Sequence, residues 1–439
     1  MALNLSRNTR VFVSTNAADT GFTSANTWEI QVMAGYSLTQ NTEQQTITIN
    51  EMGSKPTRGQ RSFNTALSPA EFSFSTYMRP HISGGNVTAT ERLLWNALTG
   101  NKQFVAPANY KQIATATVVG GVGTIDFSAA HGLAVGDSFN MVGFPEADWN
   151  VKAVVASVVD ADTVTVSFPY STPTTVNPTE TNAKAVTSQW TETASRAYVD
   201  FFNSNAHQLA PLYLIFKIDT SWYRIASAVV NQATINFAID GIAMIDWQGM
   251  GTELLNLGTT GQTEILANAV APVVTAPFIT NKLSTVTLQA GIGGTGTTYN
   301  VPITGGSITI NNNVTFLTPD ILGTVNKAVG YFTGTRAISG NLTAYLRTGT
   351  GNPTSKLLED VLAQAQTEDE NFYKLAVEIG GGTSATRVVL DMPAVQLQVP
   401  TISVEDVIST DISFTAQGYT GSAYDIEKTN ELVVSYYTA

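Results

Sequence analysis

The sequence contains no cysteine. This absence excludes disulfide bonds, thiolate metal sites and cysteine nucleophiles. Charged residues are also scarce, at 13% of the chain, which is about half the share usual in globular proteins. Thr, Asn, Ser and Gln supply most of the polarity instead. Such a composition is typical of extended β-structure with neutral surfaces, and neutral surfaces often meet copies of themselves.

Basic residues are the scarcer charged class: 22 Lys and Arg stand against 34 Asp and Glu, which gives a net charge of −12. Proteins that hold nucleic acid place Lys and Arg against phosphates, so this balance argues against direct DNA binding. The most apolar stretch, residues 265–279, is short and interrupted by Asn268, Pro272 and Pro277, and it cannot span a bilayer. The N-terminus lacks the apolar segment of a signal peptide. We therefore expect a soluble protein, made in a cytoplasm, with no membrane partner.

Motifs for catalysis or cofactor binding are missing as well. The chain has three histidines: His81, His131 and His207. They lie far apart, and none has a second ligand at a metal-binding spacing. The acidic groups at 160–162 and 368–370 lack the rest of a calcium loop. Residues 291–296 match the dinucleotide motif GxGxxG but precede a strand with a proline instead of a helix, so we interpret them as a hairpin. The sequence predicts no enzyme, no metal site and no cofactor.

Short runs of alternating apolar residues dominate the chain, as in residues 212–218. A period of two predicts half-buried strands, so we expect a mainly β protein. Helix signals occur in only two prominent places, at 88–100 and 353–362. In the first, Thr88 and Glu91 form a candidate capping box.

The two helical segments share one apolar spacing, displaced by 264 residues: Leu93, Leu94, Ala97 and Leu98 against Leu357, Leu358, Val361 and Leu362. Four further matches follow in the same order: 28–35 with 299–306, 77–79 with 345–347, 212–218 with 373–379, and 248–249 with 417–418. Five matches in one order indicate a duplicated domain.

The displacement falls from 264 to 161 between the second helix match and the strand match, so the first copy carries 103 additional residues. Their middle predicts a small β-domain, with strands near 114–119, 124–127, 138–142, 151–159 and 163–168. The predicted organisation is a first copy at 1–111 and 188–257, an inserted β-domain at 112–187, a linker at 258–277, a second copy at 278–421 and a C-terminal extension at 422–439.

One loop concentrates positive charge in this acidic chain, through Lys55, Arg58 and Arg61. The loop is either a solvated hairpin tip or a contact with an acidic neighbour in an assembly. Nucleic-acid binding is a weaker interpretation, because no aromatic residues are interleaved with the bases.

Three segments resemble the major tail proteins of long-tailed bacteriophages: residues 30–80, which include FSFSTYMRP, residues 204–249, and residues 334–346. Together with the repeat, the resemblance covers both copies, about three quarters of the chain. It implies two tandem tube domains, each a β-sandwich flanked by one helix, whose inner strands join those of neighbouring chains. Three chains would then form a ring with six domains, and rings would stack into a hollow conduit through which DNA is ejected into the host.

The same resemblance implies the partners and the location. The partners are other copies of the chain in homotrimeric rings and the tail terminator, tape measure and baseplate or tip proteins, while DNA only passes through the lumen. The protein would be assembled in the host cytoplasm and reside in the virion tail. A conduit wall poor in basic residues also avoids phosphate contacts that would retain DNA.

Two other functions fit the same pattern. One is the tube protein of a contractile tail or related injection machine, which shares the domain. The other is a carbohydrate-binding adhesin or tail-fibre module, which exposed aromatic clusters would favour. Five tryptophans fall instead in patterns typical of a core: Trp28, Trp95, Trp190, Trp222 and Trp247.

Overall fold

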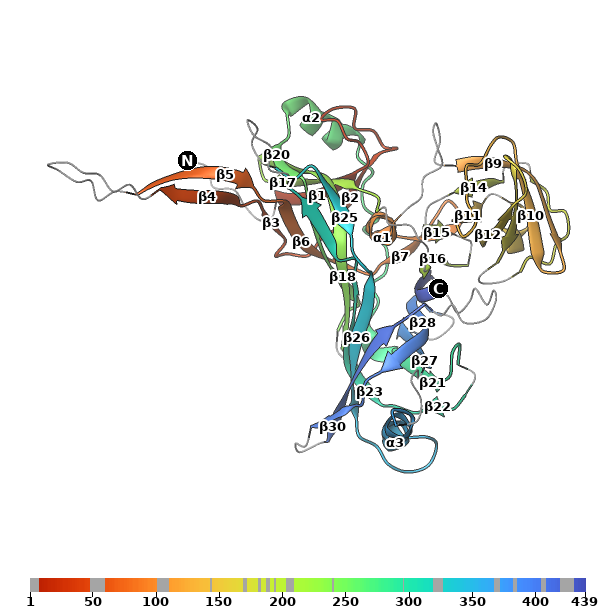
Figure 1. The fold of residues 1–439 in the computed structure, drawn as a ribbon. Helices are drawn as coiled ribbons and strands as arrows, with labels where there is room; N and C mark the ends of the chain where they lie inside the picture. Colours follow the sequence, from red (N-terminus) through yellow and green to blue (C-terminus); the bar gives the residue numbers. More distant parts are fainter. Residues whose placement is uncertain are drawn as a thin grey trace.

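The computed structural model confirms a mainly β protein (Figure 1). Three α-helices accompany the strands in the part of the chain that the structure describes. The described residues are 8–47, 60–100, 110–142, 144–168, 172–180, 183–186, 190–192, 195–202, 209–238, 241–294, 296–318, 327–366, 372–381, 385–403, 408–418 and 430–439.

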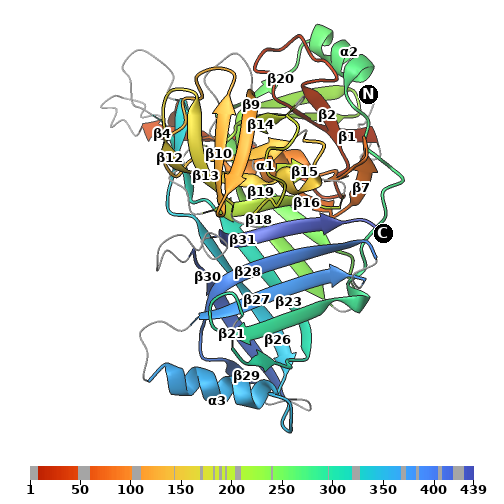
Figure 2. The ribbon, with the colours of Figure 1, turned by 90° about the vertical axis from the view of Figure 1, so that its right-hand side faces the viewer.

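One antiparallel sheet runs through the whole molecule, and we call it the spanning sheet (Figures 1 and 2). In the order of pairing, its strands are β3 (Ser37–Thr39), β6 (Ala70–Tyr77), β19 (Met244–Gly251), β18 (Ser221–Ala238), β23 (Ile303–Asn311), β26 (Ala337–Tyr345), β30 (Ser409–Ala416) and β29 (Thr401–Ser403). The pairing of β18 with β23 joins the two halves of the sequence in one sheet.

Alternation along the strands makes one face of the spanning sheet apolar. On β6, Phe72 and Phe74 are buried, whereas Ser73 and Ser75 lie on the opposite face, because successive side chains of a strand point to opposite sides. The apolar face packs against α1 (Arg92–Thr99). This packing forms the main core.

A second layer of strands lies in each half. In the first half it contains β2 (Thr27–Ile30), β1 (Thr9–Ser14), β17 (Leu212–Ile218) and β20 (Glu253–Asn256), which pair with each other or with β18. In the second half it contains β22 (Thr298–Tyr299), β21 (Thr285–Ala290), β27 (Phe372–Gly380), β28 (Arg387–Leu397) and β31 (Asn430–Tyr437).

The C-terminal strand β31 connects the two halves. It pairs with β28 on one side and with β16 (Ala197–Phe202) on the other, and β16 in turn pairs with β15 (Trp190–Glu192). Residues 430–437, which the sequence analysis assigns to a C-terminal extension, are therefore an integral part of the sheet.

The pattern of strand pairing occurs twice. In the first half β1 pairs with β2 and β17, β17 with β18, and β18 with β19 and β20. In the second half β21 pairs with β22 and β27, β27 with β28, and β28 with β30 and β31. One hydrogen bond is also repeated: Ser75 Oγ donates to Asp246 Oδ1 at 2.5 Å, and Thr343 Oγ1 donates to Asp411 Oδ1 at 2.8 Å.

The ladders correct one correspondence of the sequence repeat. Asp246 and Asp411 occupy equivalent places and are displaced by 165 residues, whereas the motif match of Gln248–Gly249 with Gln417–Gly418 requires 169. The motif match is thus wrong by four residues. A two-residue motif carries no information about strand register, which the hydrogen-bonding partner decides.

Residues 110–186 contain a closed six-stranded barrel with its own core (Figure 1). Its strands are β9 (Tyr110–Val119), β10 (Val122–Phe127), β11 (Ser138–Val142), β12 (Lys152–Val158), β13 (Thr163–Ser167) and β14 (Lys184–Val186), with the 3-10 helix η2 (Ala147–Trp149) between β11 and β12. Five of these strands lie where the alternation predicts them. The sixth, β14, has only three residues and closes the barrel by pairing with β9 and β11.

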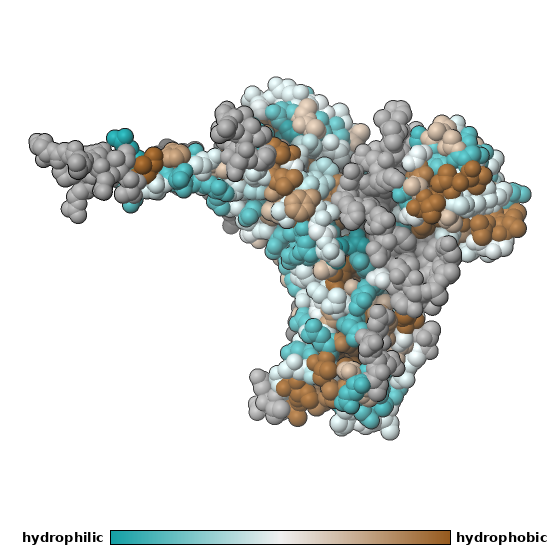
Figure 3. Space-filling model, in the orientation of Figure 1, coloured by the Kyte–Doolittle hydropathy of each residue, from teal (hydrophilic) through white to brown (hydrophobic). Residues whose placement is uncertain are grey.

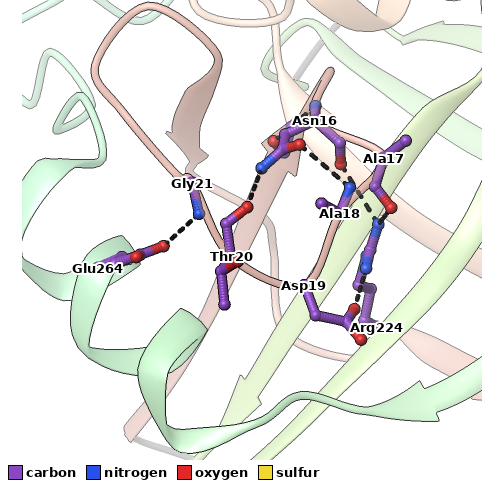
Figure 4. A network of polar contacts seen from close by, with 9 residues as sticks. Asn16, Ala17, Ala18, Asp19, Thr20, Gly21, Arg224 and Glu264 are labelled. Atoms are coloured by element: carbon purple, nitrogen blue, oxygen red, sulfur yellow. Dashed lines mark hydrogen bonds and ion pairs between the residues drawn. The ribbon is translucent and has the colours of Figure 1, made fainter.

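The segment between the halves is not only a linker, because it contains α2 (Thr259–Asn268). This helix packs on the loop between β1 and β2, and Glu264 accepts hydrogen bonds from the backbone N–H groups of Gly21 and Phe22 (Figure 4). Beneath the same loop, the buried guanidinium of Arg224 pairs with Asp19 and donates to the carbonyl oxygen of Ala17 at 2.5 Å. The 3-10 helix η3 (Asn281–Leu283) follows.

The capping box proposed for α1 is wrong. The helix begins at Arg92, Glu91 occupies the N-cap without a side-chain capping bond, and Thr88 Oγ1 donates to Glu192 instead. The second helix, α3 (Thr354–Gln364), is confirmed, although Leu362 of its expected apolar face is exposed. In both helices, contacts with distant strands decide which side chains are buried.

Three hairpins complete the fold. They are β4 (Thr42–Ile47) with β5 (Arg61–Leu67), β7 (Pro80–Ser83) with β8 (Asn86–Ala89), and β24 (Val314–Leu317) with β25 (Gly330–Thr333). The hairpin β4–β5 projects from the body as an arm (Figure 1). The hairpin β24–β25 follows β23 as β4–β5 follows β3, but it packs on the first half through Val314, Leu209 and Val229.

Candidate functional site: a polar sheet face with two open edges

The second face of the spanning sheet is polar along its whole length, and we call it the polar face. Its side chains come from both halves of the sequence: Ser37, Thr39, Glu71, Ser73, Ser75, Gln232, Thr234, Asn236, Asp246, Gln248, Ser307, Thr309, Asn311, Ser339, Asn341, Thr343, Asp411, Ser413 and Thr415. Figure 3 shows hydrophilic residues over β6. The sheet bends so that β3 and β30 lie toward the same side, away from α1 and the barrel (Figure 1). The polar face is therefore the concave one.

Hydrogen bonds between strands hold the side chains of the polar face in place. Ser37 Oγ and Ser73 Oγ lie 2.8 Å apart. Ser307 Oγ donates to Asn341 Oδ1 at 2.7 Å. Because these hydroxyls and amides satisfy one another, the face offers few unpaired groups to a passing molecule.

The hydrogen-bonded network continues across the junction of the two halves. Thr234 Oγ1 of β18 and Thr309 Oγ1 of β23 lie 3.2 Å apart. On the same strand as Thr234, Asn236 Nδ2 donates to Asp246 Oδ2 at 2.8 Å. The two halves thus present one continuous surface.

The charges of the polar face are all negative in the part of the chain that the structure describes. They come from Glu71, Asp246 and Asp411, and none of the side chains that the ladders place on this face is Lys or Arg. A phosphate backbone is held mainly by Lys and Arg. The polar face is thus chemically suited to let a polyanion pass without binding it.

Each end of the spanning sheet is an open edge. Among the described residues, β3 pairs only with β6, and β29 pairs only with β30. Ile402 in the middle of β29 is 43% exposed, whereas Ile235 and Ile308, which face each other at the β18–β23 junction, are fully buried. Open edges with exposed apolar residues are templates for pairing with another chain.

A buried polar cluster lies on the other side of the spanning sheet, at the start of α1. Trp95 Nε1 donates to Tyr436 Oη at 2.6 Å, and the Tyr436 hydroxyl is hydrogen-bonded to the Glu91 carboxyl. Burial raises the pKa of Glu91 above its usual range, and burial also raises the pKa of Tyr436. This cluster joins α1 of the first half to β31, so it serves the interior of the subunit.

Most residues examined for chemistry have structural roles. His131 is buried in a turn, where its Nδ1 accepts a hydrogen bond from the backbone N–H of Leu133 at 2.8 Å. Residues 291–296 connect β21 and β22, as the hairpin interpretation predicts. Within the described ranges, no group of three or more His, Asp or Glu residues could hold a metal ion. His207 and the acidic run at 368–370 lie outside the described residues.

The basic loop is only partly described. Lys55 and Arg58 lie outside the described residues, and Arg61 is exposed at the start of β5, opposite Ile47. Of the five tryptophans expected in the core, four are buried and Trp28 is half-buried. No helix in the described part of the chain is long and apolar enough to cross a membrane.

The sequence analysis did not identify the polar face, although its signal is present. Ser, Thr, Asn or Asp occupies alternate positions on β6, β23, β26 and β30, and each run by itself reads as an ordinary solvated strand face. The continuity of these runs depends on the order of the strands, which a single strand does not encode.

Comparison with known proteins agrees with these features. A family model described as phage tail tube protein matches residues 101–416. The chain is also similar to the tail tube protein pb6 of Escherichia phage T5, with 29% identity over an alignment of 458 positions that covers 99% of this chain and 79% of pb6.

Proposed function

The chain belongs to the phage tail tube protein family, and from this membership we propose that three copies close into a ring by pairing β3 of one chain with β29 of the next. As a member of the family, the protein is a structural subunit of the tail of the virion and assembles with itself and with other tail proteins. The pairing is carried by one observation: the junction between the two halves of a single chain already contains the same contact.

The repeated ladders define the register of this contact. Within the chain, Thr234, Ile235 and Asn236 of β18 face Thr309, Ile308 and Ser307 of β23. The equivalents of the β18 residues are Thr401, Ile402 and Ser403, and the equivalents of the β23 residues are Thr39, Leu38 and Ser37. In the proposed ring, Thr401 therefore faces Thr39 of the next chain, Ile402 faces Leu38, and Ser403 faces Ser37. Both open strands have three residues, which matches this register.

Burial of apolar surface favours the pairing. Ile402 is 43% exposed in the subunit, while its equivalent Ile235 is fully buried against β23. Pairing the edges would bury Ile402 against Leu38 and satisfy the open backbone groups of both strands. The contact joins different surfaces of two chains, so it continues around an axis until the ring closes.

We further propose that the three-chain ring has six similar domains, two from each chain. The support is the repeated pairing pattern, which assigns β1–β6 and β17–β20 to one domain and β21–β31 to the other. The barrel at 110–186 would be a domain inserted in the first. In this arrangement the polar face lines the conduit, DNA passes along it, and the chain performs no catalysis.

The basic loop remains a separate proposal, in which Lys55, Arg58 and Arg61 contact acidic residues of an adjacent ring. Its support is the local concentration of positive charge in an acidic chain. Changing all three residues to Gln should weaken ring stacking most at raised salt, where the remaining electrostatic attraction is screened. Tubes of unchanged length at all salt concentrations would leave the loop as a solvated tip.

Ring closure is tested by placing a charge on the open edge. In Ile402→Lys the subunit should fold, because the side chain is half-exposed, but rings and tubes should be lost. The matched control is Val158→Lys, since Val158 is also 43% exposed and lies on the barrel. Size-exclusion chromatography with light scattering and electron microscopy measure the outcome. Rings from Ile402→Lys in the yield of the control would disprove the proposed edge.

A further inference from the structure

The segment that connects the two halves carries a stripe of exposed apolar side chains. We call it the linker stripe: Leu266, Val270, Val274, Phe278 and Leu283, which are 53%, 39%, 68%, 53% and 66% exposed. Five large apolar residues on one connecting segment form more than a scatter of single exposed residues, and such patches mark interaction sites.

The backbone of the linker stripe is held firmly on the body. The backbone N–H of Glu29 donates to the carbonyl oxygen of Val270 at 2.9 Å, and that of Ala243 donates to Ile279 at the same distance. Arg79 Nη2 donates to the carbonyl oxygen of Val274 at 2.8 Å, and its guanidinium lies over the ring of Phe278. The exposed side chains are therefore presented by an anchored segment.

The same segment also has an inward side. Ala276 and Ile279 are buried between the exposed positions. At the upper end, α2 carries Leu266 outward while the neighbouring Ile265 is buried and Glu264 binds the loop below (Figure 4). A segment that already has a buried side but still exposes large apolar residues has a second surface to cover.

The linker stripe and the hairpins lie on opposite sides of the subunit. In the view of Figure 2 the spanning sheet continues from top to bottom, so the proposed ring extends in that direction. The linker descends from α2 along the right side, whereas β4 of the arm lies at the left. The two sides are the faces that a ring presents to its neighbours above and below in a stack.

The geometry points to the linker stripe as a contact between stacked rings, with the hairpins β4–β5 and β24–β25 of a second copy of this chain as its occupant. This inference rests on the proposed ring. The hairpins offer a matching apolar surface: Ile47 and Phe63 on the first are 42% and 45% exposed, and Leu317 and Phe332 on the second are 52% and 50% exposed.

Stoichiometry and symmetry fit this pairing. Each chain contributes one linker stripe and one pair of hairpins, so every stripe in a ring meets one pair in the next ring. The contact joins two different surfaces and therefore repeats without closing, as a filament along an axis requires.

Charge on the linker stripe tests the inference. Val274→Asp should leave subunits folded and rings intact but abolish tubes, because an unpaired carboxylate would be buried in the stack. Val119→Asp is the matched control, since Val119 is 75% exposed and lies on the barrel, and it should form tubes of normal length. Electron microscopy measures rings and tubes. Tubes of normal length from Val274→Asp, or loss of rings together with tubes, would overturn the inference.

Engineered cysteines give a second measurement, because the chain has no cysteine of its own. Tubes are formed from Val274→Cys together with Phe63→Cys, or with Phe332→Cys, and then oxidised. Disulfide-linked chains in either tube are expected and support the contact, whereas their absence from both overturns it. If the unmodified protein forms neither rings nor tubes, the proposed function itself fails, which distinguishes the two failures.

Discussion

Phe72 and Gly249 face each other across β6 and β19, and Gly340 and Phe414 face each other across the equivalent strands β26 and β30. The large and the small residue have exchanged strands between the two halves. Each half therefore places one aromatic ring over one glycine. A Cβ atom on Gly249 would lie 2.2 Å from the carbonyl oxygen of Val229 and 2.4 Å from the Phe72 ring, so this position accepts no side chain.

Gly249→Ala should therefore destabilise the subunit by about 1–3 kcal/mol, as overpacking of a filled core does. Gly258→Ala is the control, because a Cβ there meets no atom within 4 Å, and its stability should not fall. Thermal and denaturant unfolding of the isolated subunits measure both variants. Equal stability of Gly249→Ala and Gly258→Ala would show that the Phe–Gly contact does not limit packing.

Glu91 is the residue through which pH should affect the subunit. Its carboxyl is buried beside Tyr436, with Arg79 nearby, and burial raises its pKa. A raised pKa in the folded state means that stability is complete below the carboxyl pKa of the unfolded chain, about 4.3, and declines as pH rises through the folded pKa.

Glu91→Gln should remove this decline. The variant should match the natural protein near pH 4 and unfold at a higher temperature at pH 7 to 8, because it buries no charge at either pH. Unfolding midpoints over this pH range test the expectation. A constant difference between the two proteins at all pH values would locate the effect in packing instead of ionisation.

At the scale of elements, the barrel behaves as an independent unit. Its buried residues form a core separate from the main one. Tyr110 of its first strand faces Val186 of its last, so the two ends of the segment lie side by side. The barrel also lies beyond α1, on the side opposite the polar face (Figure 1).

Replacing residues 112–187 with a short Gly/Ser linker should leave tube formation intact. The ends already lie next to each other, so a short flexible linker spans them, and the spanning sheet loses no strand. Electron microscopy of the shortened protein measures tube formation. A folded subunit that no longer forms tubes would show that the barrel takes part in assembly.

At the scale of the whole molecule, the paired edges make the number of chains per ring measurable. With Leu38→Cys and Ile402→Cys in one chain, each subunit should form a disulfide with both neighbours, because directly opposed residues on paired strands have nearby Cβ atoms. Closed rings of three chains should give a covalent trimer as the largest product on a non-reducing gel. Covalent hexamers, or monomers with both cysteines joined internally, would rule out the three-chain ring.

The amino-acid sequence by itself determined the local features of this protein. Alternation along β6, β17 and β26 was enough to predict strands, and the apolar spacing at 92–99 and 354–364 was enough to predict helices. These signals are local, because side-chain direction follows from the strand or helix period alone. The duplication was also visible, since copies of a domain keep the same order of such signals.

Only the tertiary structure decided which strands meet and in which register. It placed Asp411 opposite Thr343 and so shifted the Gln–Gly match by four residues, directed Thr88 to Glu192 instead of a helix cap, and placed residues 430–437 within the sheet. Each of these outcomes depends on a partner more than 60 residues away in the sequence. The polar face and its open edges arise in the same way, because a surface made by eight strands exists only once their order is set.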